Sequence, residues 1–150
     1  MDSKPRLVLD KMSEKLNEIY IEGVRTTVRF MEAQTVKAGV ECDIYSFPGD
    51  SSRDLAVVRV EKGYKTPLQK VILGTKTTEI FMSGTGNLTV HSDEGETKIY
   101  NFDSKSNNRE VIVKLGEMMQ WRAVTSLVFY EICEPPYEDG RFQNIDETSV

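Results

Sequence analysis

Residues 63–86, GYKTPLQKVILGTKTTEIFMSGTG, decide which fold this chain adopts. The stretch contains two apolar runs that are too short for helices, and glycines stand at positions 63, 74, 84 and 86. Short apolar runs bounded by glycine, proline and threonine are typical of β-strands joined by tight turns. We therefore expect two strands here, at residues 70–73 and 79–83.

The same pattern extends in both directions along the chain. Apolar and polar residues alternate with a period of two, and clusters of Gly, Asp, Asn and Ser separate the alternating segments. No helical pattern lies between these segments, which argues against parallel crossover units and favours an antiparallel sandwich or barrel. The expected fold class is mostly β, with further strands at 24–30, 36–45, 55–61, 88–91, 98–102, 110–114, 118–121 and 127–133.

The two ends of the chain differ from this pattern. Apolar residues from Leu9 to Tyr20 recur at spacings of three and four, which predicts a short amphipathic helix that ends at Gly23. Pro135 and Pro136 cannot continue a central strand, so the chain is expected to leave the sheet after residue 134. The predicted organisation is a helical lead-in at 1–23, a β-barrel at 24–134, and an arm and tail at 135–150.

Composition restricts the possible partners and the cellular location. The 150 residues fit one domain, 39% are hydrophobic, and the net charge is −5. An acidic balance argues against binding to nucleic acid or anionic membranes, and no apolar run is long enough to span a bilayer. The amino terminus lacks the apolar core of a signal peptide, so a cytoplasmic protein with reduced, buried Cys42 and Cys133 is expected.

At this point residues 36–141 resemble the cupin family, whose fold is a small antiparallel β-barrel (a jelly roll) built from two sheets. The first cupin motif consists of a glycine, five residues, His-x-His, a short gap, a glutamate, six residues and a glycine. Here Gly63 is followed after five residues by Gln69-Lys70-Val71, and Glu79 is followed after six residues by Gly86. An alternative alignment moves the two histidine positions to Leu73 and Thr75.

Neither cupin motif keeps its histidines. The second motif begins Gly-Asp and ends with a histidine in the family, whereas this chain has Gly116-Glu117-Met118-Met119-Gln120-Trp121-Arg122-Ala123. The only histidine of the chain is His91, which lies outside both motifs. A transition-metal site normally needs three or four ligands from His, Cys, Asp and Glu, so the resemblance implies a cupin barrel without a metal or other cofactor.

The residues that remain at the motif positions are the candidate site residues. A buried Glu79 would have a raised pKa unless a positive partner such as Arg59 offset the burial, and it is the candidate general base. The remaining candidates for ligand binding offer amides or flat rings, but each has a plain alternative in core packing or a surface ion pair: Gln69, Gln120, Trp121 and Tyr130. Tyr130 and Glu131 alternate on one strand, so only one of them faces the barrel.

Three functions follow from this resemblance and these residues. The leading one is a metal-free cupin that binds a small polar molecule, a sugar or an organic acid, in its barrel. The first alternative is a metal-independent isomerase, epimerase or lyase that uses Glu79 as its general base. The second alternative is a protein-interaction module that forms a homodimer, with the arm around Tyr137 and Phe142 packed across the barrel or onto a second subunit.

Overall fold

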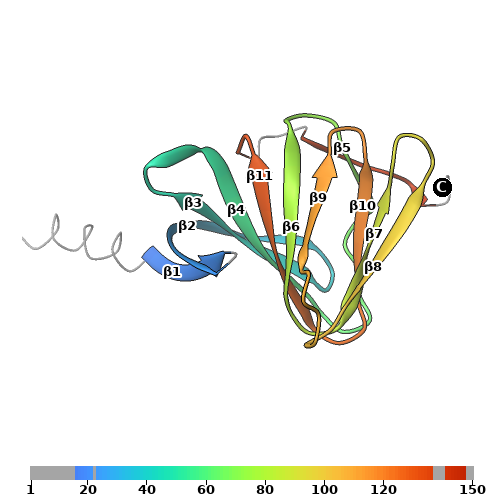
Figure 1. Cartoon of the computed structure of the whole chain (residues 1–150), viewed down its shortest axis with the longest axis horizontal. Coiled ribbons are helices and arrows are strands. Elements are labelled where there is room, and N and C mark those ends of the chain that lie inside the picture. The colour runs from blue at the N-terminus through green and yellow to red at the C-terminus, as the bar shows by residue number, and fades with distance from the viewer. Residues whose placement is uncertain (1–15, 22, 137–140, 148–150) are drawn as a thin grey trace, which may run out of the picture.

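The computed structural model describes residues 16–21, 23–136 and 141–147, and these residues form twelve β-strands (Figure 1). The strands are β1 (Leu16–Ile21), β2 (Val24–Lys37), β3 (Val40–Phe47), β4 (Asp50–Val60), β5 (Gln69–Val71), β6 (Lys76–Ser83), β7 (Gly86–His91), β8 (Thr97–Phe102), β9 (Glu110–Lys114), β10 (Met118–Ala123), β11 (Leu127–Glu134) and β12 (Phe142–Asn144). None of the described residues forms a helix that is long and apolar enough to span a bilayer.

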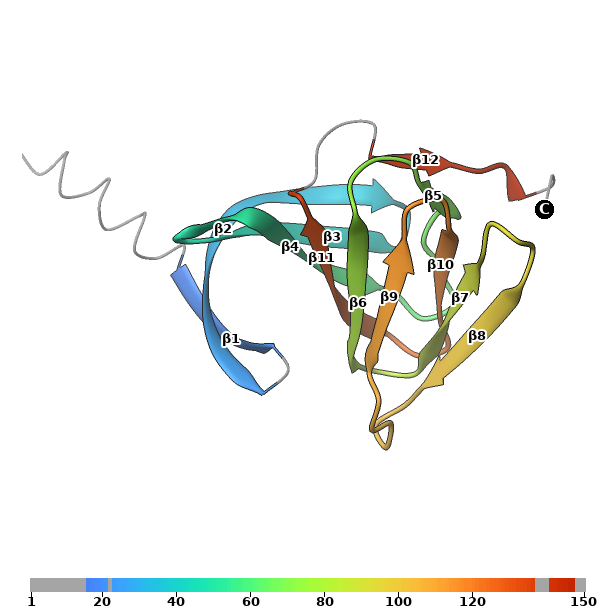
Figure 2. The ribbon, with the colours of Figure 1, turned by 45° about the horizontal axis from the view of Figure 1, so that its top comes forward.

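The strands belong to two antiparallel sheets that curl around a common interior (Figures 1 and 2). The larger sheet has the order β1-β2-β3-β4-β11-β6-β9, and the smaller sheet has the order β12-β5-β10-β7-β8. Side chains from the two facing sheets fill the space between them, as the alternation of apolar residues predicts. The predicted mostly β, cupin-like barrel is therefore confirmed.

The stretch at residues 63–86 supplies one strand to each sheet. Its first apolar run is β5 in the smaller sheet, and its second is β6 in the larger sheet. The chain crosses between the sheets through Gly74, which has a φ of 89° and lies against the Arg141 side chain. Gly84 has a φ of 93° and ends β6, after which β7 returns to the smaller sheet.

The main core lies between the two sheets and contains a continuous stack of four aromatic rings. The stack runs from Phe81 through Phe102 and Trp121 to Phe129, with successive ring centroids 5.0, 5.5 and 4.4 Å apart. Trp121 is thus held between two phenylalanines, and its side chain is only 2% exposed. Such stacking fixes the direction of the indole ring and therefore of its N–H group.

A second core lies on the other face of the larger sheet, under the β1–β2 hairpin. Ile21 and Val28 from this hairpin belong to one buried cluster with Phe47, Ile80 and Ile132. In Figure 2 the hairpin curls away from the barrel end of the sheet. The hairpin therefore belongs to the packed structure of the domain.

This arrangement corrects the prediction of an amino-terminal helix. Leu16, Ile19 and Tyr20 lie in β1, where each residue pairs with β2 in an antiparallel register. The apolar residues of this segment are spaced as in an amphipathic helix. Its β-branched residues and the burial of Ile21 nevertheless favour a strand, because β2 is available to pair with it. The rest of the predicted helix, residues 9–15, lies outside the described residues.

Two other predicted boundaries differ from the structure. The single strand expected at 36–45 is divided between β2 and β3 by a tight turn at Gly39, which has a φ of 77° and packs beneath the Tyr64 ring. The carboxyl-terminal arm leaves the larger sheet after Glu134, as predicted, but Phe142–Asn144 then pairs with β5 of the same chain as β12. Phe142 packs against the main core, and Tyr137 lies outside the described residues.

Candidate functional site

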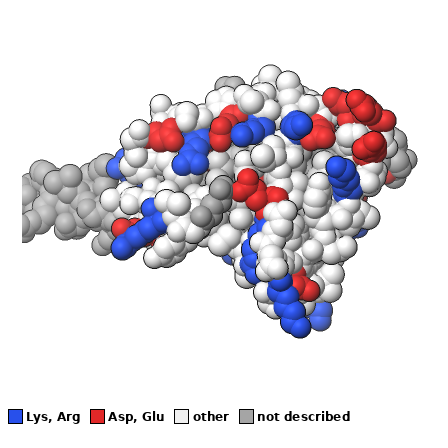
Figure 3. Space-filling model, in the orientation of Figure 1, with Lys and Arg blue, Asp and Glu red and all other residues white. Residues whose placement is uncertain are grey.

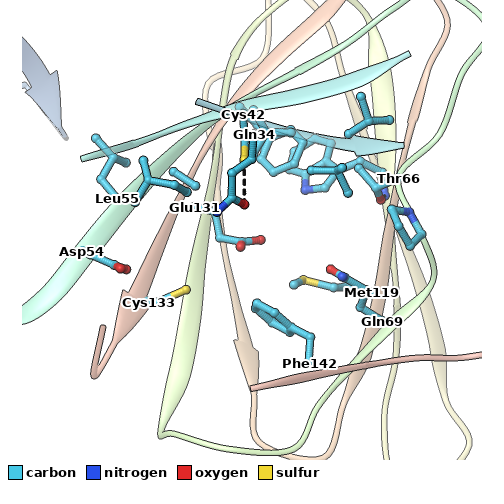
Figure 4. A pocket seen from close by; sticks show the side chains of 18 residues that line it. Gln34, Cys42, Asp54, Leu55, Thr66, Gln69, Met119, Glu131, Cys133 and Phe142 are labelled. Carbon is cyan, nitrogen blue, oxygen red and sulfur yellow. Dashed lines mark hydrogen bonds between the residues drawn. The ribbon is translucent and has the colours of Figure 1, made fainter. Parts of the chain in front are cut away.

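A cavity of about 180 Å³ lies inside the barrel, where β11 and the β2–β4 part of the larger sheet face β5, β10 and β12 (Figure 4). Most of its wall is apolar, and the polar groups come from separate strands. Figure 4 shows the Glu131 carboxylate directed toward the middle of the ring of labelled side chains. The polar, acidic and thiol side chains that line the cavity are Gln34, Cys42, Asp54, Thr66, Gln69, Glu131 and Cys133.

Glu131 is half of a buried pair of carboxyl groups. It lies directly across from Glu79 in the antiparallel register of β11 and β6, and Glu79 is 0% exposed. The indole Nε1 of Trp121 donates a hydrogen bond of 2.8 Å to Glu79 Oε1. The other side chains that interact with the Glu79 carboxyl group are the Glu131 carboxyl group and the Thr77 hydroxyl group.

Two carboxyl groups can hydrogen-bond to each other only if one of them carries a proton. Burial raises the pKa of Glu79 well above its ordinary value, and the negative charge of Glu131 raises that pKa further. Burial also raises the pKa of Glu131, whereas the hydrogen bond from Glu79 and the charge of Arg141 lower it. Glu79 is therefore the protonated member, and Glu131 presents the carboxylate to the cavity.

Of the predicted ligand-binding residues, Trp121 and Gln69 line the cavity. Gln69 lies at the start of β5, where its Nε2 donates to Asn144 Oδ1 at 3.2 Å and its Oε1 remains as an acceptor. Gln120 is buried but does not line the cavity. Its Nε2 donates to Thr66 O at 2.8 Å and to Glu147 Oε1 at 3.1 Å, so it holds the chain around Thr66 to β10.

Arg59 and Tyr130 lie away from the cavity. Arg59 donates a 2.9 Å hydrogen bond to Asp43 Oδ2 at a surface ion pair, so the proposed pairing with Glu79 is wrong. Tyr130 packs into the second core on the outer face of the larger sheet. The sequence left open which of Tyr130 and Glu131 faces the barrel. In the structure Glu131 faces the barrel interior, and Tyr130 faces the other side of the sheet.

Both cysteines line the cavity as free thiols. Cys42 pairs with Val58 across β3 and β4, while Cys133 pairs with Asp54 across β11 and β4. They thus stand four residues apart along β4 and on opposite sides of it, which is too far for a disulfide. Burial raises the pKa of Cys42 to about 11 and raises that of Cys133 as well, so both remain protonated and poorly nucleophilic.

Sequence reasoning left open whether Tyr130 or Glu131 faces the barrel, and it named only Tyr130 among the candidate ligand-binding residues. The available signal was an acidic residue inside LVFYEIC, an otherwise apolar strand segment at 127–133. Both faces of that strand are packed, so residues on its two sides look alike in sequence. Cys42, Cys133 and Phe142 were likewise recognised as packing residues without any indication that they share one cavity.

The three-dimensional structure is similar to those of several larger proteins. CapF, determined with the inhibitor 3-isopropenyl-tropolone, matches with a TM-score of 0.59 and 11% identity over 79% of this chain and 34% of CapF. Bacillus subtilis oxalate decarboxylase matches with a TM-score of 0.57 and 19% identity over 69% of this chain and 28% of that protein.

Salicylate 1,2-dioxygenase from Pseudoaminobacter salicylatoxidans in complex with gentisate matches with a TM-score of 0.54 and 18% identity. The match covers 67% of this chain and 26% of the dioxygenase. The chain thus spans between about a quarter and a third of the length of these neighbours. No family model and no curated protein matches the sequence.

The oxalate decarboxylase has Mn(II) centres, so the fit of this chain to a metal must be considered. Within residues 16–21, 23–136 and 141–147, no group of three His, Cys, Asp or Glu side chains is arranged to hold a metal ion. The two carboxyl groups of the site are joined to each other, and Glu79 Oε1 already accepts the indole N–H. His91 lies at the β7–β8 hairpin, with its Nδ1 2.9 Å from Thr97 Oγ1.

These donors do not fit a transition metal of the kind that three or four ligands hold. The likeness to the three neighbours is one of three-dimensional structure, at 11–19% sequence identity. All three neighbours are members of the cupin superfamily. This chain has the cupin fold.

Proposed function

We propose that this cupin domain binds a small polar molecule inside its barrel, at the Glu131 carboxylate. A cavity of 180 Å³ has the volume of about six water molecules, so it suits a compact ligand of a few carbon atoms. The observation that carries the proposal is one carboxylate held by a buried partner on an otherwise largely apolar wall. Pockets with a few convergent polar groups on apolar walls are typical of ligand sites.

The two ligand classes predicted from the sequence are not equally well supported. An organic acid would place its carboxylate near Glu131 in a water-poor site, where like charges repel strongly. A neutral ligand with hydroxyl groups could donate to Glu131 and to Gln69 Oε1 instead. An organic acid anion is therefore disfavoured, and a ligand whose groups donate hydrogen bonds to Glu131 is preferred.

This proposal requires no bound metal. Its support is the character of the donors, since the carboxyl pair and the amide of Gln69 bind hydrogen-bonding groups better than they bind iron, zinc or manganese. Phe102 and Phe129 cover the two faces of Trp121, so Trp121 presents only a ring edge to the cavity, and Phe129 at the end of the stack offers the apolar ring surface on which the carbon atoms of the ligand can pack. Polar recognition would then come from Glu131 and the amide, and most of the buried area from the rings.

A thermal-shift screen of small sugars and polyols tests the proposal. A ligand of the folded state raises the melting temperature in a concentration-dependent manner. Glu131→Gln should remove the shift, because the acceptor charge is lost while the side-chain shape is kept. Tyr130→Phe is the matched control, since it alters the neighbouring residue on the opposite face of β11 and should leave the shift unchanged. If no compound shifts the melting temperature, or if both variants behave alike, the cavity is not the binding site.

The shared proton supports a second candidate function, proton transfer to and from a carbon acid, as in an isomerase, epimerase or lyase. The sequence prediction gave the role of base to Glu79, but this residue is fully buried and does not line the cavity. Glu131 is better placed to receive a proton from a ligand, and Glu79 can stabilise the carboxylate through the hydrogen bond between them.

Exchange of a ligand C–H for deuterium in heavy water, followed by proton NMR, separates this candidate from simple binding. Any ligand found in the screen should lose its exchangeable C–H signal in the presence of the protein. The Glu131→Gln variant should lose this exchange, whereas Tyr130→Phe should retain it. A bound ligand that shows no exchange over days would rule out proton transfer and leave the binding proposal intact.

A further inference from the structure

The charged side chains among the described residues that line the cavity all have the same sign. Two of the described residues that line it are acidic, Glu131 on β11 and Asp54 on β4, and none of the described lining residues is Lys, Arg or His. Asp54 lies close enough to raise the pKa of Glu131 by charge repulsion. The walls between the two acidic residues are made largely of apolar side chains, which keep the local dielectric low and strengthen the field.

The nearest positive charge lies behind the cavity wall. Arg141 is 1% exposed, does not line the cavity, and donates to three backbone carbonyl oxygens, at Pro135 (2.7 Å), Lys76 (2.6 Å) and Glu134 (3.2 Å). Its positive charge lowers the pKa of Glu131 and so helps that carboxylate to remain ionised. Its Nη1 and Nη2 groups donate to backbone oxygens, while its Nε is buried without a hydrogen-bond partner among the described residues. Because Arg141 does not line the cavity, a ligand there would meet the Glu131 carboxylate first.

Aromatic and sulfur groups complete the wall. Trp121, Phe129 and Phe142 line the cavity together with Met119. The faces of aromatic rings carry negative electrostatic potential and attract organic cations, most strongly where water is excluded. Phe102 and Phe129 cover both faces of Trp121, so this attraction comes from Phe129 at the end of the stack. An acidic group among aromatic rings is the usual environment for an ammonium ion on an apolar body, whereas a neutral sugar would use only part of this field.

We propose that the ligand of this cavity is a small organic cation, a protonated amine on a compact apolar body, with its charge held at Glu131. This proposal rests on the proposed function and adds the chemical class of the ligand. The ammonium group would donate hydrogen bonds to the Glu131 carboxylate, and the carbon atoms would pack against Trp121 and Phe129. Asp54 would contribute attraction over a longer distance, so it should matter less than Glu131.

Three probes that share one ring test the charge directly: benzylamine, benzyl alcohol and benzoate. Isothermal titration calorimetry at pH 7 measures their affinities for the whole chain. Benzylamine should bind at least ten times more tightly than benzyl alcohol, and benzoate should bind most weakly. Glu131→Gln should weaken benzylamine at least tenfold and benzyl alcohol by a clearly smaller factor, and Asp54→Asn should weaken benzylamine less than Glu131→Gln does. Tyr130→Phe should change none of these values.

The outcomes separate this inference from the proposed function. Equal binding of benzylamine and benzyl alcohol, or preference for benzoate, would overturn the cation proposal while the cavity remained a binding site. Binding of sugars but of none of the three probes would do the same. Failure of every amine, alcohol, acid and sugar would overturn both proposals. If Glu131→Gln did not fold, as judged by its circular dichroism melting curve, the Asp54→Asn variant would still have to reduce benzylamine binding for the proposal to stand.

Discussion

The proton shared by Glu79 and Glu131 has a thermodynamic consequence that depends on one residue. Folding buries both carboxyl groups, and the pKa of Glu79 rises well above the value of 4.5 that applies in an exposed chain. The folded protein therefore binds more protons than the unfolded protein between those two pKa values. The stability that the protonated pair supplies is complete below pH 4.5 and is lost as pH rises through the pKa of the folded state.

Glu79→Gln should remove this pH dependence. A glutamine amide can donate to Glu131 as the protonated acid does, and its oxygen can still accept the hydrogen bond from Trp121 Nε1. The variant should be more stable than the original protein at pH 8, by about 1 kcal/mol if only one net hydrogen bond of the pair depends on the proton. Urea unfolding between pH 5 and pH 9 measures the difference.

Glu61→Gln is the matched control for this experiment, because Glu61 is an exposed carboxylate just after β4. It should leave the slope of unfolding free energy against pH unchanged. If the original protein and the Glu79→Gln variant have parallel curves across this range, the buried pair does not hold an extra proton. The proposed division of roles between Glu79 and Glu131 would then be wrong.

At the residue scale, the sequence predicted part of the site. Glu79 could be proposed as an interior residue from the motif spacing alone, because β6 is buried on both faces and its burial does not alternate. Its partner could not be identified, since Arg59 and Glu131 belong to strands whose register with β6 depends on the tertiary fold. Alternation in β11 also left two solutions, because a packed core lies on each face of that strand.

At the scale of elements, Arg141 fastens the carboxyl-terminal arm to the barrel. Its guanidinium group joins the end of β11 to the start of β6, and its own backbone oxygen accepts hydrogen bonds from Ile72 and Leu73. The arm then continues into β12, which closes the cavity through Phe142. Closure of the cavity thus depends on one buried side chain.

Arg141→Met should lower the unfolding free energy by roughly 2–4 kcal/mol, because methionine keeps an apolar stem but leaves buried carbonyl oxygens without donors. Gly74→Ala should also destabilise the protein, since the new Cβ would overlap the Arg141 guanidinium at a positive φ. The double variant should lose less stability than the sum of the losses in the two single variants, because both substitutions remove the same contact. Urea unfolding of the original protein, the two single variants and the double variant measures the four free energies of this double-mutant cycle.

Gly95→Ala isolates the cost of the positive φ itself. Gly95 has the same φ of 89° as Gly74, but no atom lies within 4 Å of the position that a Cβ would occupy. The difference between the Gly74 and Gly95 variants therefore measures the overlap with Arg141. If the two variants lost equal stability, Arg141 would not be packed against Gly74.

Element boundaries show where local patterns were sufficient. The strands from β5 to β11 lie within a few residues of their predicted positions, because each alternating segment is bounded by turn-forming residues. The prediction failed where two patterns competed, as between Leu16 and Tyr20. It also failed at Gly39, since a two-residue turn leaves the alternation undisturbed while reversing the chain direction.

At the scale of the whole molecule, the β1–β2 hairpin offers a surface for a second copy of the chain. β1 is an edge strand of the larger sheet, and Tyr20 and Val24 beside it are 63% and 64% exposed. Exposed edge strands with apolar side chains are prone to pair with other strands. We predict a homodimer in sedimentation velocity at micromolar concentration, and a monomer for the Tyr20→Lys/Val24→Lys variant.

Ile99→Lys/Asn101→Lys, at two exposed positions on β8, adds the same two positive charges and is the control that should not affect assembly. A monomer at all concentrations, or a dimer that the hairpin variant leaves intact, would exclude this edge as the interface.

Figure 3 shows Lys and Arg interspersed with Asp and Glu over most of the visible face, with acidic groups gathered near the β7–β8 hairpin. No basic patch on that face suggests a nucleic acid as the alternative partner.

The stack of four rings places the single tryptophan where its intrinsic fluorescence can report on the cavity. Its single tryptophan is fixed between phenylalanines, touches the cavity, and bonds through its indole N–H to the acid whose proton is in question. Emission intensity and wavelength should therefore respond to occupancy of the barrel and to ionisation of the acid pair, with no attached dye. One fluorimeter titration, repeated at several pH values, would follow both events in the unmodified chain.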